Sequence, residues 1–350
     1  MKYSLIIAAA MTAALTVAGC SPQKKSTVHC IDEPVNLATP AGIGQYLTKL
    51  PAVENVSNWE NEFAPGVTIT TKHYEIHTTL LEPLLLNRVP CFMESAYLAY
   101  QKQLPSPISS DIKYKIYLFG DRSQWEEFTK EIAGENSHLY LKIKKGAYYL
   151  NGVCVAYDIG RDRTLSVLAH EGWHQFNSRH FAYRLPSWLD EGIATMFEST
   201  TVDKTGYNFD PAYNLGRLGS LRKMLLSGKI IPLEKLISLN PGEVVAHADT
   251  EAVMAFYAQS YALIRFLREE GYGRHLDKYH NLLLGACNGT WPLDESLEKV
   301  ACDRNIPLTA NWNRHVSPKL FSSYISEDYN KMHAEYAAFC KKIARTVRLK

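Results

Sequence analysis

The feature that most constrains the fold is a His-Glu-x-x-His sequence that begins at His170 and ends at His174. It lies in residues 162–177, where apolar residues recur at helical spacing. Residues four apart lie on one face of a helix, about a turn apart, so two imidazoles can reach one metal ion. Glu171 then lies beside the metal rather than on it. The sequence therefore predicts a helix that presents two metal ligands.

A carboxylate on the next predicted helix supplies a third ligand. The segment that starts at Trp188 reads Trp-Leu-Asp-Glu-Gly-Ile-Ala-Thr and carries Glu191 near the first turn of that helix. Catalytic zinc takes three protein ligands and keeps a fourth position for water, and His, His and Glu form one known set. We therefore predict a Zn²⁺ site made by His170, His174 and Glu191. Glu171 would act as the general base for an attacking water.

The segment from His170 to Thr195 resembles the gluzincin aminopeptidase family of zinc metallopeptidases and the related peptidase MA-like domains. The likeness lies in His-Glu-x-x-His-Gln-aromatic followed by Trp-Leu-x-Glu-Gly-x-Ala-Thr. It implies that Glu191 is the third zinc ligand, that the fold is zincin-like and that peptides or proteins are the substrates. The spacing from His174 to Glu191 is slightly shorter than in the aminopeptidases, so the connecting loop must be tighter.

A second likeness to the aminopeptidases begins at Tyr257. The sequence Tyr-Ala-Gln-Ser there resembles the aminopeptidase segment Tyr-Glu-Lys-Gly, whose tyrosine donates a hydrogen bond to the oxyanion of the tetrahedral intermediate. The resemblance makes Tyr257 the candidate for that catalytic role. The alternative is a core tyrosine on an amphipathic helix. Tyr261, one turn further on, is the next candidate.

Three other side chains compete for a place in the site. Glu198 and Asp190 can orient a ligand histidine, but helix-capping or surface roles explain them equally well, so neither is included in the predicted site. Cys154 precedes the His-Glu-x-x-His helix, and a His, His, Cys set would indicate deformylase-like chemistry. Because the sequence around Cys154 is not deformylase-like, Glu191 is the preferred third ligand.

The kind of peptidase stays open. The aminopeptidase signature Gly-x-Met-Glu-Asn, which anchors a substrate N-terminus, is absent, and Gly-Val-Cys-Val-Ala occupies that stretch. An endopeptidase is therefore as consistent with the sequence as an aminopeptidase. Residues 152–157 are expected to form an edge strand that lines the cleft and pairs with an extended peptide. The alternative function is a non-catalytic envelope binding or assembly lipoprotein that retains the zincin fold and the metal.

Two kinds of hydrophobic pattern divide the chain near residue 163. Before it, strand and helix patterns alternate, and a hairpin turns at Asn151-Gly152. The expected elements there are strands 66–77, 113–120, 148–150 and 152–157, and helices 80–104 and 122–132. The later patterns are helical, at about 164–178, 187–199, 212–227, 250–270 and 274–286. We predict an α+β fold: a small mixed-sheet lobe at 62–163, then a mainly helical lobe at 164–350, with the active-site helix at their junction.

The first twenty residues indicate export. Lys2 precedes an uncharged apolar run that is short for a membrane span and ends on small residues, as a signal peptide over 1–19 would. Val-Ala-Gly-Cys at its end resembles a bacterial lipobox, which implies that Cys20 is lipidated and holds the mature chain on a membrane. Ser21 fits outer-membrane sorting if the host has two membranes. A plain secretory signal or an uncleaved helix is the alternative, and 20–61 is expected to be a tether and extended lead-in.

Composition limits the remaining possibilities. The 350 residues, 46% of them hydrophobic, suffice for a large core. Because 38 basic and 36 acidic residues are spread along the chain, there is no basic stripe and nucleic acid is excluded as a partner. An even number of further cysteines in an oxidising compartment predicts at least one disulfide. They are Cys30, Cys91, Cys154, Cys287, Cys302 and Cys340.

Overall fold

The structure is a computed structural model, and it describes residues 36–108, 110–144, 146–203, 206–240, 250–303 and 309–346. The predicted signal peptide, the lipobox and Cys20 lie outside these residues. Among the helices that are described, none combines the length and the apolar character that a membrane crossing needs.

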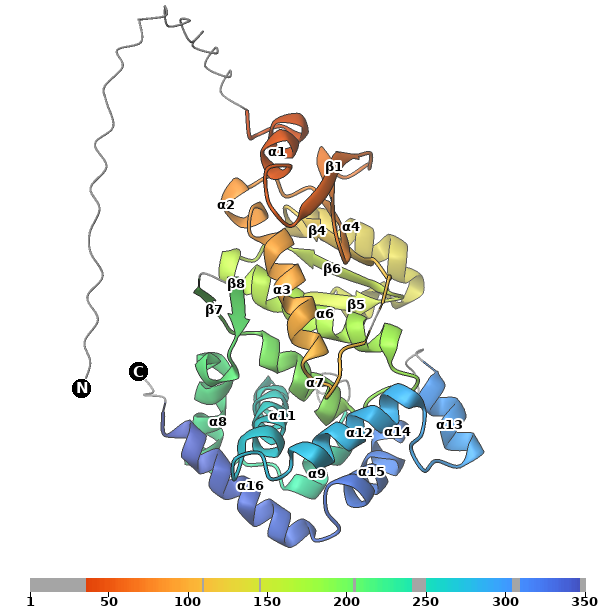
Figure 1. Ribbon diagram of the computed structural model, residues 1–350, viewed down its shortest axis with the longest axis vertical. Helices are drawn as coiled ribbons and strands as arrows, with labels where there is room; N and C mark the ends of the chain where they lie inside the picture. Colours follow the sequence, from red (N-terminus) through yellow and green to blue (C-terminus); the bar gives the residue numbers. More distant parts are fainter. Residues whose placement is uncertain are drawn as a thin grey trace, which may run out of the picture. The chain divides into compact units, whose positions relative to one another are not determined.

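A six-stranded mixed sheet forms the first part of the fold, in the order β1-β2-β3-β4-β6-β5 (Figure 1). The pairs β3–β4 and β4–β6 are parallel, and the other neighbours are antiparallel. The strands are β1 (Val53–Trp59), β2 (Gly66–Thr71), β3 (Tyr74–Thr78), β4 (Tyr114–Phe119), β5 (Ala147–Leu150) and β6 (Val153–Tyr157). The predicted small mixed sheet is thus confirmed.

The predicted extended lead-in to residue 61 is wrong over much of its length, because helix α1 (Pro40–Leu47) and strand β1 lie within it. Pro40 begins α1, where a missing N–H costs no hydrogen bond, and the Thr39 hydroxyl caps the helix by accepting from the Gly42 N–H. Strand β1 lies at the edge of the sheet and its burial does not alternate, so it lacks the usual strand pattern.

The single strand predicted at 66–77 is two strands, β2 and β3, joined by a turn without glycine or proline. The Glu94 carboxylate holds this turn, because it accepts from the Thr71 hydroxyl at 2.6 Å and from the His73 N–H at 2.8 Å. His73 Nδ1 lies 2.6 Å from the same carboxylate. A side chain distant in sequence therefore makes a turn that local propensity does not reveal.

The helix predicted at 80–104 is also divided, into α2 (Pro83–Leu86) and α3 (Val89–Gln101). Pro90 stands in the first turn of α3 and cannot donate to the carbonyl four residues earlier, so one continuous helix is excluded. The helix predicted at 187–199 is α7 (Ser187–Ala194), which continues as a 3₁₀ turn, η2 (Thr195–Phe197).

The hairpin through Asn151-Gly152 is confirmed, with positive φ at both turn residues (50° and 88°). Its second arm, however, is not an edge strand. Strand β6 lies between β4 and β5, and β5 is the edge. The turn residues specify the hairpin but not which arm meets β4, and the connection through α4 (Arg122–Ala133) brings β6 beside β4.

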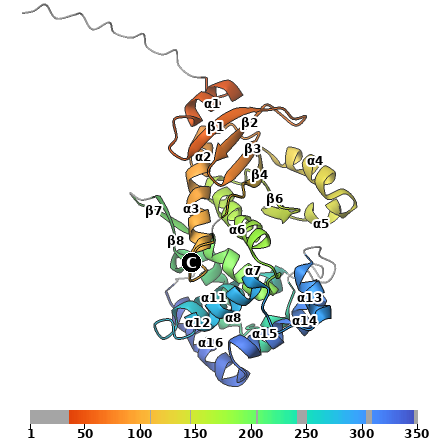
Figure 2. The ribbon, with the colours of Figure 1, turned by 45° about the vertical axis from the view of Figure 1, so that its right-hand side comes forward.

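Helices cover both faces of the sheet, and Figure 2 shows α3 and α4 on opposite sides of it. Successive residues of β6 face different cores: Cys154 belongs to the cluster beneath α3 and α6 (Arg161–His180), and Val155 to the cluster with Trp125 and Phe128 of α4. The Cys154 side chain is fully buried. Helix α6 therefore lies against the sheet through an apolar layer.

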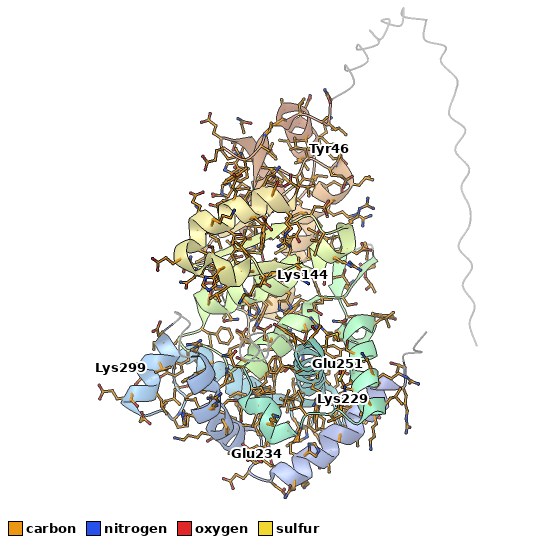
Figure 3. The ribbon with its side chains drawn as sticks, turned by 180° about the vertical axis from the view of Figure 1, so that it is seen from behind. Tyr46, Lys144, Lys229, Glu234, Glu251 and Lys299 are labelled. Carbon is orange, nitrogen blue, oxygen red and sulfur yellow. The ribbon has the colours of Figure 1, made fainter. Side chains whose placement is uncertain are left out.

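The rest of the fold is mainly helical, as predicted, and Figure 3 shows Glu234, Glu251 and Lys299 on helices of this region, with Lys229 in the connection that follows the helix ending at Ser227. A hairpin that was not predicted, β7 (Thr200–Asp203) and β8 (Gly206–Phe209), packs on Phe92 of α3 through Tyr207 and Phe209. The helices are α8 (Leu215–Ser227), α9 (Leu233–Ser238), α11 (Thr250–Glu269), α12 (Leu276–Asn288), α13 (Glu295–Cys302), α14 (Thr309–His315), α15 (Ser317–Tyr324) and α16 (Tyr329–Ala344).

The predicted disulfide is not found among the described cysteines. Cys91, Cys154, Cys287, Cys302 and Cys340 are all free thiols, and Cys30 lies outside the described residues. They are distributed over five elements: α3, β6, α12, α13 and α16. An even count does not by itself bring two sulfur atoms together.

Two motif glycines permit close helix packing. A Cβ on Gly192 of α7 would lie 2.6 Å from Ile264 Cγ1 and 2.8 Å from the Ser260 carbonyl oxygen of α11. Gly172 of α6 likewise faces the Tyr100 hydroxyl of α3 with no room for a Cβ. The glycine in each motif therefore fixes how closely its helix approaches a neighbour.

We predict that Gly192→Ala destabilises the protein by about 1–3 kcal/mol, because the clash with a backbone oxygen outweighs the better helix propensity of alanine. Gly219→Ala in α8 is the matched control, since a Cβ there meets nothing within 4 Å. Urea denaturation measures both variants. Equal or greater stability of the Gly192 variant would contradict the packing argument.

Candidate metal centre

Helix α6 carries both histidines and is tied to the sheet by polar contacts. The Gln175 side-chain amide donates to the carbonyls of Lys115 and Gly152, at 2.8 Å in both cases. The Tyr100 hydroxyl donates to the Ala169 carbonyl at 2.7 Å. These contacts lie on either side of the histidine pair in sequence and fix the rotation of α6 about its axis.

Helix α7 is held in place by hydrogen bonds to helices near the C-terminus, α14 and α15. The Ser187 N–H at its start donates to the Asn313 side chain at 2.8 Å, and the Trp188 indole donates to the Ser317 hydroxyl at 2.9 Å. Both partners follow α7 by more than a hundred residues in sequence. The position of Glu191 on α7 thus depends on the C-terminal helices as well as on α11.

The three predicted ligands converge on one point. Glu191 Oε2 lies 3.2 Å from His170 Nε2 and 3.6 Å from His174 Nε2. Their side chains are 11% (His170), 12% (His174) and 18% (Glu191) exposed, so the group is largely buried and retains some access to solvent. Among the described residues, these three side chains form the cluster of potential ligands that could hold a metal ion. Cys154 is not part of it.

The remaining imidazole nitrogens each face a further carboxylate. His170 Nδ1 lies 2.9 Å from Glu198 Oε1, and His174 Nδ1 lies 3.0 Å from Asp190 Oδ1. A neutral imidazole that donates through Nδ1 presents a lone pair at Nε2. Both lone pairs therefore point at the Glu191 carboxylate, which is an acceptor as well. This arrangement needs a cation at the centre, either a metal ion or protons on the rings.

The separations fit a tetrahedral ion. With zinc–ligand bonds of about 2.0–2.1 Å, two ligand atoms of a tetrahedron lie about 3.3 Å apart. The two Glu191 distances, 3.2 and 3.6 Å, lie close to that value. The Glu191 separations therefore suit one zinc-sized ion, and all three ligand atoms lie within 4.8 Å of one another.

Asp190 and Glu198 are site residues that the sequence analysis left out. Asp190 Oδ1 accepts from His174 Nδ1, from the Trp173 indole at 3.0 Å and from the Asn177 amide at 2.8 Å. Its donors are thus a ligand histidine and two neighbours on the same helix. The signal that could have identified both carboxylates is their position in the Glu191 segment, one residue before and seven residues after the ligand.

Arg217 is a site residue that the sequence did not indicate at all. Its guanidinium binds Glu198 with both arms, Nε at 2.8 Å and Nη2 at 2.6 Å. Asn214, the N-cap of α8, also donates to Glu198 at 3.0 Å. Arg217 lies on a different helix from the motifs, and no spacing rule connects it with them.

The charges of the site reinforce one another. Burial raises the pKa of Glu198, but Arg217 and His170 outweigh burial and bring the pKa to about 2. Burial likewise raises the pKa of Glu191, and both histidines reverse that effect, so its pKa lies well below the usual range. Burial lowers the pKa of His170, yet hydrogen bonds to these carboxylates raise it to about 9. The site as a whole favours positive charge on or between the imidazoles.

Glu171 differs from the other carboxylates. It is partly buried, and none of the described residues hydrogen-bonds to its side chain. Burial raises its pKa, against the opposing effect of His170 and His174. Glu171 is therefore a carboxylate beside the histidine pair that is free to exchange a proton.

The structure brings Tyr257 to the site and leaves Tyr261 out of it. The Tyr257 ring centroid lies 6.3 Å from that of His170, and no described residue hydrogen-bonds to its hydroxyl. The Tyr261 hydroxyl instead donates to the Pro211 carbonyl and accepts from Arg265. Of the two candidates, Tyr257 therefore has the free hydroxyl.

Comparison with known proteins gives no family for the chain: no protein-family model matches it, and no curated protein matches it.

We predict that Asp190→Asn weakens zinc binding by about 10–100-fold, because the uncharged amide orients and polarises His174 less well. Chelator competition measures the zinc affinity. Asp162→Asn is the control, since Asp162 is an exposed carboxylate in the first turn of α6, the helix that carries His174. Equal zinc affinity in the two variants would show that Asp190 has no role in the centre.

Proposed function

We propose that this chain is a zinc-dependent peptidase of the gluzincin type with a zincin-like fold. The observation that carries the proposal is the convergence of His170, His174 and Glu191 on one point, with the unbonded Glu171 carboxylate beside them. An α+β arrangement in which α6 packs against a small mixed sheet and joins it to a helical region supports the zincin-like assignment.

His170 and His174 would hold the zinc through Nε2, and Glu191 through a carboxylate oxygen. Zinc bound there supplies Lewis-acid chemistry, because it polarises a substrate carbonyl and lowers the pKa of a water. Structural zinc sites usually have four protein ligands. Since three are present among the described residues, a catalytic centre is favoured over the alternative, a non-catalytic envelope lipoprotein.

Glu171 would carry the proton through the reaction. It accepts a proton from the attacking water as the oxygen–carbon bond forms, and it returns that proton to the leaving amine nitrogen as the carbon–nitrogen bond breaks. A pKa raised by burial suits both steps, because the group must bind a proton and then release it. No hydrogen bond to a described residue has to break first.

Tyr257 would stabilise the negative charge that develops on the carbonyl oxygen. Its hydroxyl has no partner among the described residues, and burial keeps its pKa well above the ordinary value, so it remains a donor. A donor aimed at a developing oxyanion lowers the barrier to acyl transfer.

The substrate would be a peptide or protein in an extended conformation. Strand β5, not β6 as the sequence suggested, offers an unpaired edge for strand addition. The Tyr149 hydroxyl of β5 lies 2.6 Å from Ser178 Oγ, and Ser178 follows His174 by one turn on the ligand face of α6. The edge strand and the metal ligands therefore adjoin the same helix face.

We further propose that the enzyme works at the cell envelope. The lipobox-like sequence would place a lipid anchor on Cys20 and export the chain, to the outer membrane in a host with two membranes. Its substrates would then be envelope or environmental proteins.

We predict that Glu171→Gln lowers peptide hydrolysis by at least about 100-fold, because the amide cannot accept the proton. Zinc affinity should change little, since Glu171 is not a ligand. A digest of a peptide library by wild type, Glu171→Gln and chelated protein measures cleavage and its positions.

Full activity of the Glu171 variant would contradict the proposed mechanism. Zinc binding by the wild type without cleavage of any peptide would favour the non-catalytic lipoprotein instead. The cleavage positions in the wild-type digest separate an endopeptidase from an aminopeptidase.

We predict that Tyr257→Phe lowers kcat by about 100-fold or more with little change in KM, because the hydroxyl acts only in the transition state. Tyr261→Phe is the matched control, one turn away on the same helix. It loses structural hydrogen bonds and should retain kcat. Steady-state kinetics compare the two variants, and similar kcat values for both would remove Tyr257 from the mechanism.

A further inference from the structure

Arg217 contacts both halves of the candidate catalytic machinery. Through its edge it binds Glu198, with Nε at 2.8 Å and Nη2 at 2.6 Å, and Glu198 in turn faces His170 Nδ1 at 2.9 Å. Through its face it covers the Tyr257 ring, with the guanidinium carbon 4.9 Å from the ring centroid. One planar group thus links a metal ligand with the candidate oxyanion donor.

The Tyr257 side chain packs its ring against the hydrophobic core. Its hydroxyl has no partner among the described residues, and its ring neighbours are His170, Phe256 and the Arg217 guanidinium. A guanidinium that lies over an aromatic face is attracted to it electrostatically. Arg217 therefore restrains the ring without occupying the hydroxyl.

Arg217 itself is well anchored. Its backbone N–H donates to the Asn214 side chain at 3.1 Å, and Asn214 donates to the same Glu198 carboxylate at 3.0 Å. The Arg217 side chain is 25% exposed, against 12% for Glu198. Asn214 and Arg217, at the start of α8, thus both bind Glu198, which follows η2.

We propose that Arg217 is a positioning residue that couples His170 to Tyr257. By fixing Glu198 it sets the rotation and tautomer of the His170 ring, and by stacking it holds the Tyr257 hydroxyl where the oxyanion develops. The planar fork is essential, because a lysine ammonium supplies the same charge without two parallel hydrogen bonds. The proposal rests on the proposed peptidase function for its kinetic part and on metal binding alone for the His170 part.

The test compares Arg217→Lys with Arg222→Lys, a matched change in the same helix. Arg222 donates to the Ala344 carbonyl and has no contact with the site. Chelator competition gives the zinc affinity of each variant, and steady-state kinetics on a cleaved peptide give kcat and KM. For Arg217→Lys we expect zinc affinity about 10-fold lower or more, a lower kcat and an almost unchanged KM. Arg222→Lys should match the wild type.

A double-variant cycle tests the coupling to Tyr257. If Arg217 acts through that hydroxyl, Arg217→Lys should lower kcat much less in the Tyr257→Phe background than in the wild type, after both are saturated with zinc. Equal effects in the two backgrounds would overturn the coupling. Wild-type zinc affinity in Arg217→Lys would overturn the role toward His170.

A second variant keeps the test decisive if Arg217→Lys does not fold. Glu198→Gln leaves Arg217 in place but weakens the fork, and it should lower zinc affinity to a similar degree; unchanged affinity would overturn the proposal. The zinc measurement also separates the two hypotheses. Wild-type protein that binds zinc without hydrolysing peptides would contradict the proposed function. The zinc affinity of the Arg217 variant would still decide whether Arg217 positions His170.

Discussion

The constraint on which the rest of the site depends is charge balance in a largely buried space. Four carboxylates lie around two imidazoles: those of Glu171, Asp190, Glu191 and Glu198. Arg217 forms an ion pair with the Glu198 carboxylate. Buried carboxylates that lack a counter-charge are costly. Because both Nδ1 atoms face carboxylates, the Nε2 lone pairs and Glu191 need a shared cation. A divalent ion satisfies all three at once, whereas protonation must charge two rings that lie side by side.

The fold meets this constraint by packing rather than by the local sequence of the motifs. Ligand distances near 3.3 Å require α6 and α7 to be fixed to within a fraction of an ångström. Gly172 and Gly192 let each helix approach a neighbour closely, and the contacts of Gln175 with the sheet fix the rotation of α6. The start of α7 is held by Asn313. The C-terminal helices are therefore part of what places Glu191.

The sequence predicts the parts of this arrangement that depend on residues close together in the chain, and it does not predict the parts that depend on tertiary contacts. The ligand triad and the Asn151-Gly152 turn depend on spacing within one or two helices or on turn chemistry, and spacing is visible in a sequence. The edge position of β5 depends on which strand reaches β4, and Arg217 reaches Glu198 only because α8 folds back. These relations are tertiary, and neither periodicity nor propensity encodes them. The prediction of an extended lead-in before residue 61 was wrong because Pro40 starts a helix instead of interrupting one.

A further distinction separates the residues that hold the site from those proposed to react. Asp190 and Glu198 each accept several hydrogen bonds, so their orientation is fixed. Glu171 and the Tyr257 hydroxyl have no such partners among the described residues. Both groups therefore remain available to the reacting molecules in the proposed mechanism: a water that gives its proton to Glu171 and a carbonyl oxygen that accepts from Tyr257.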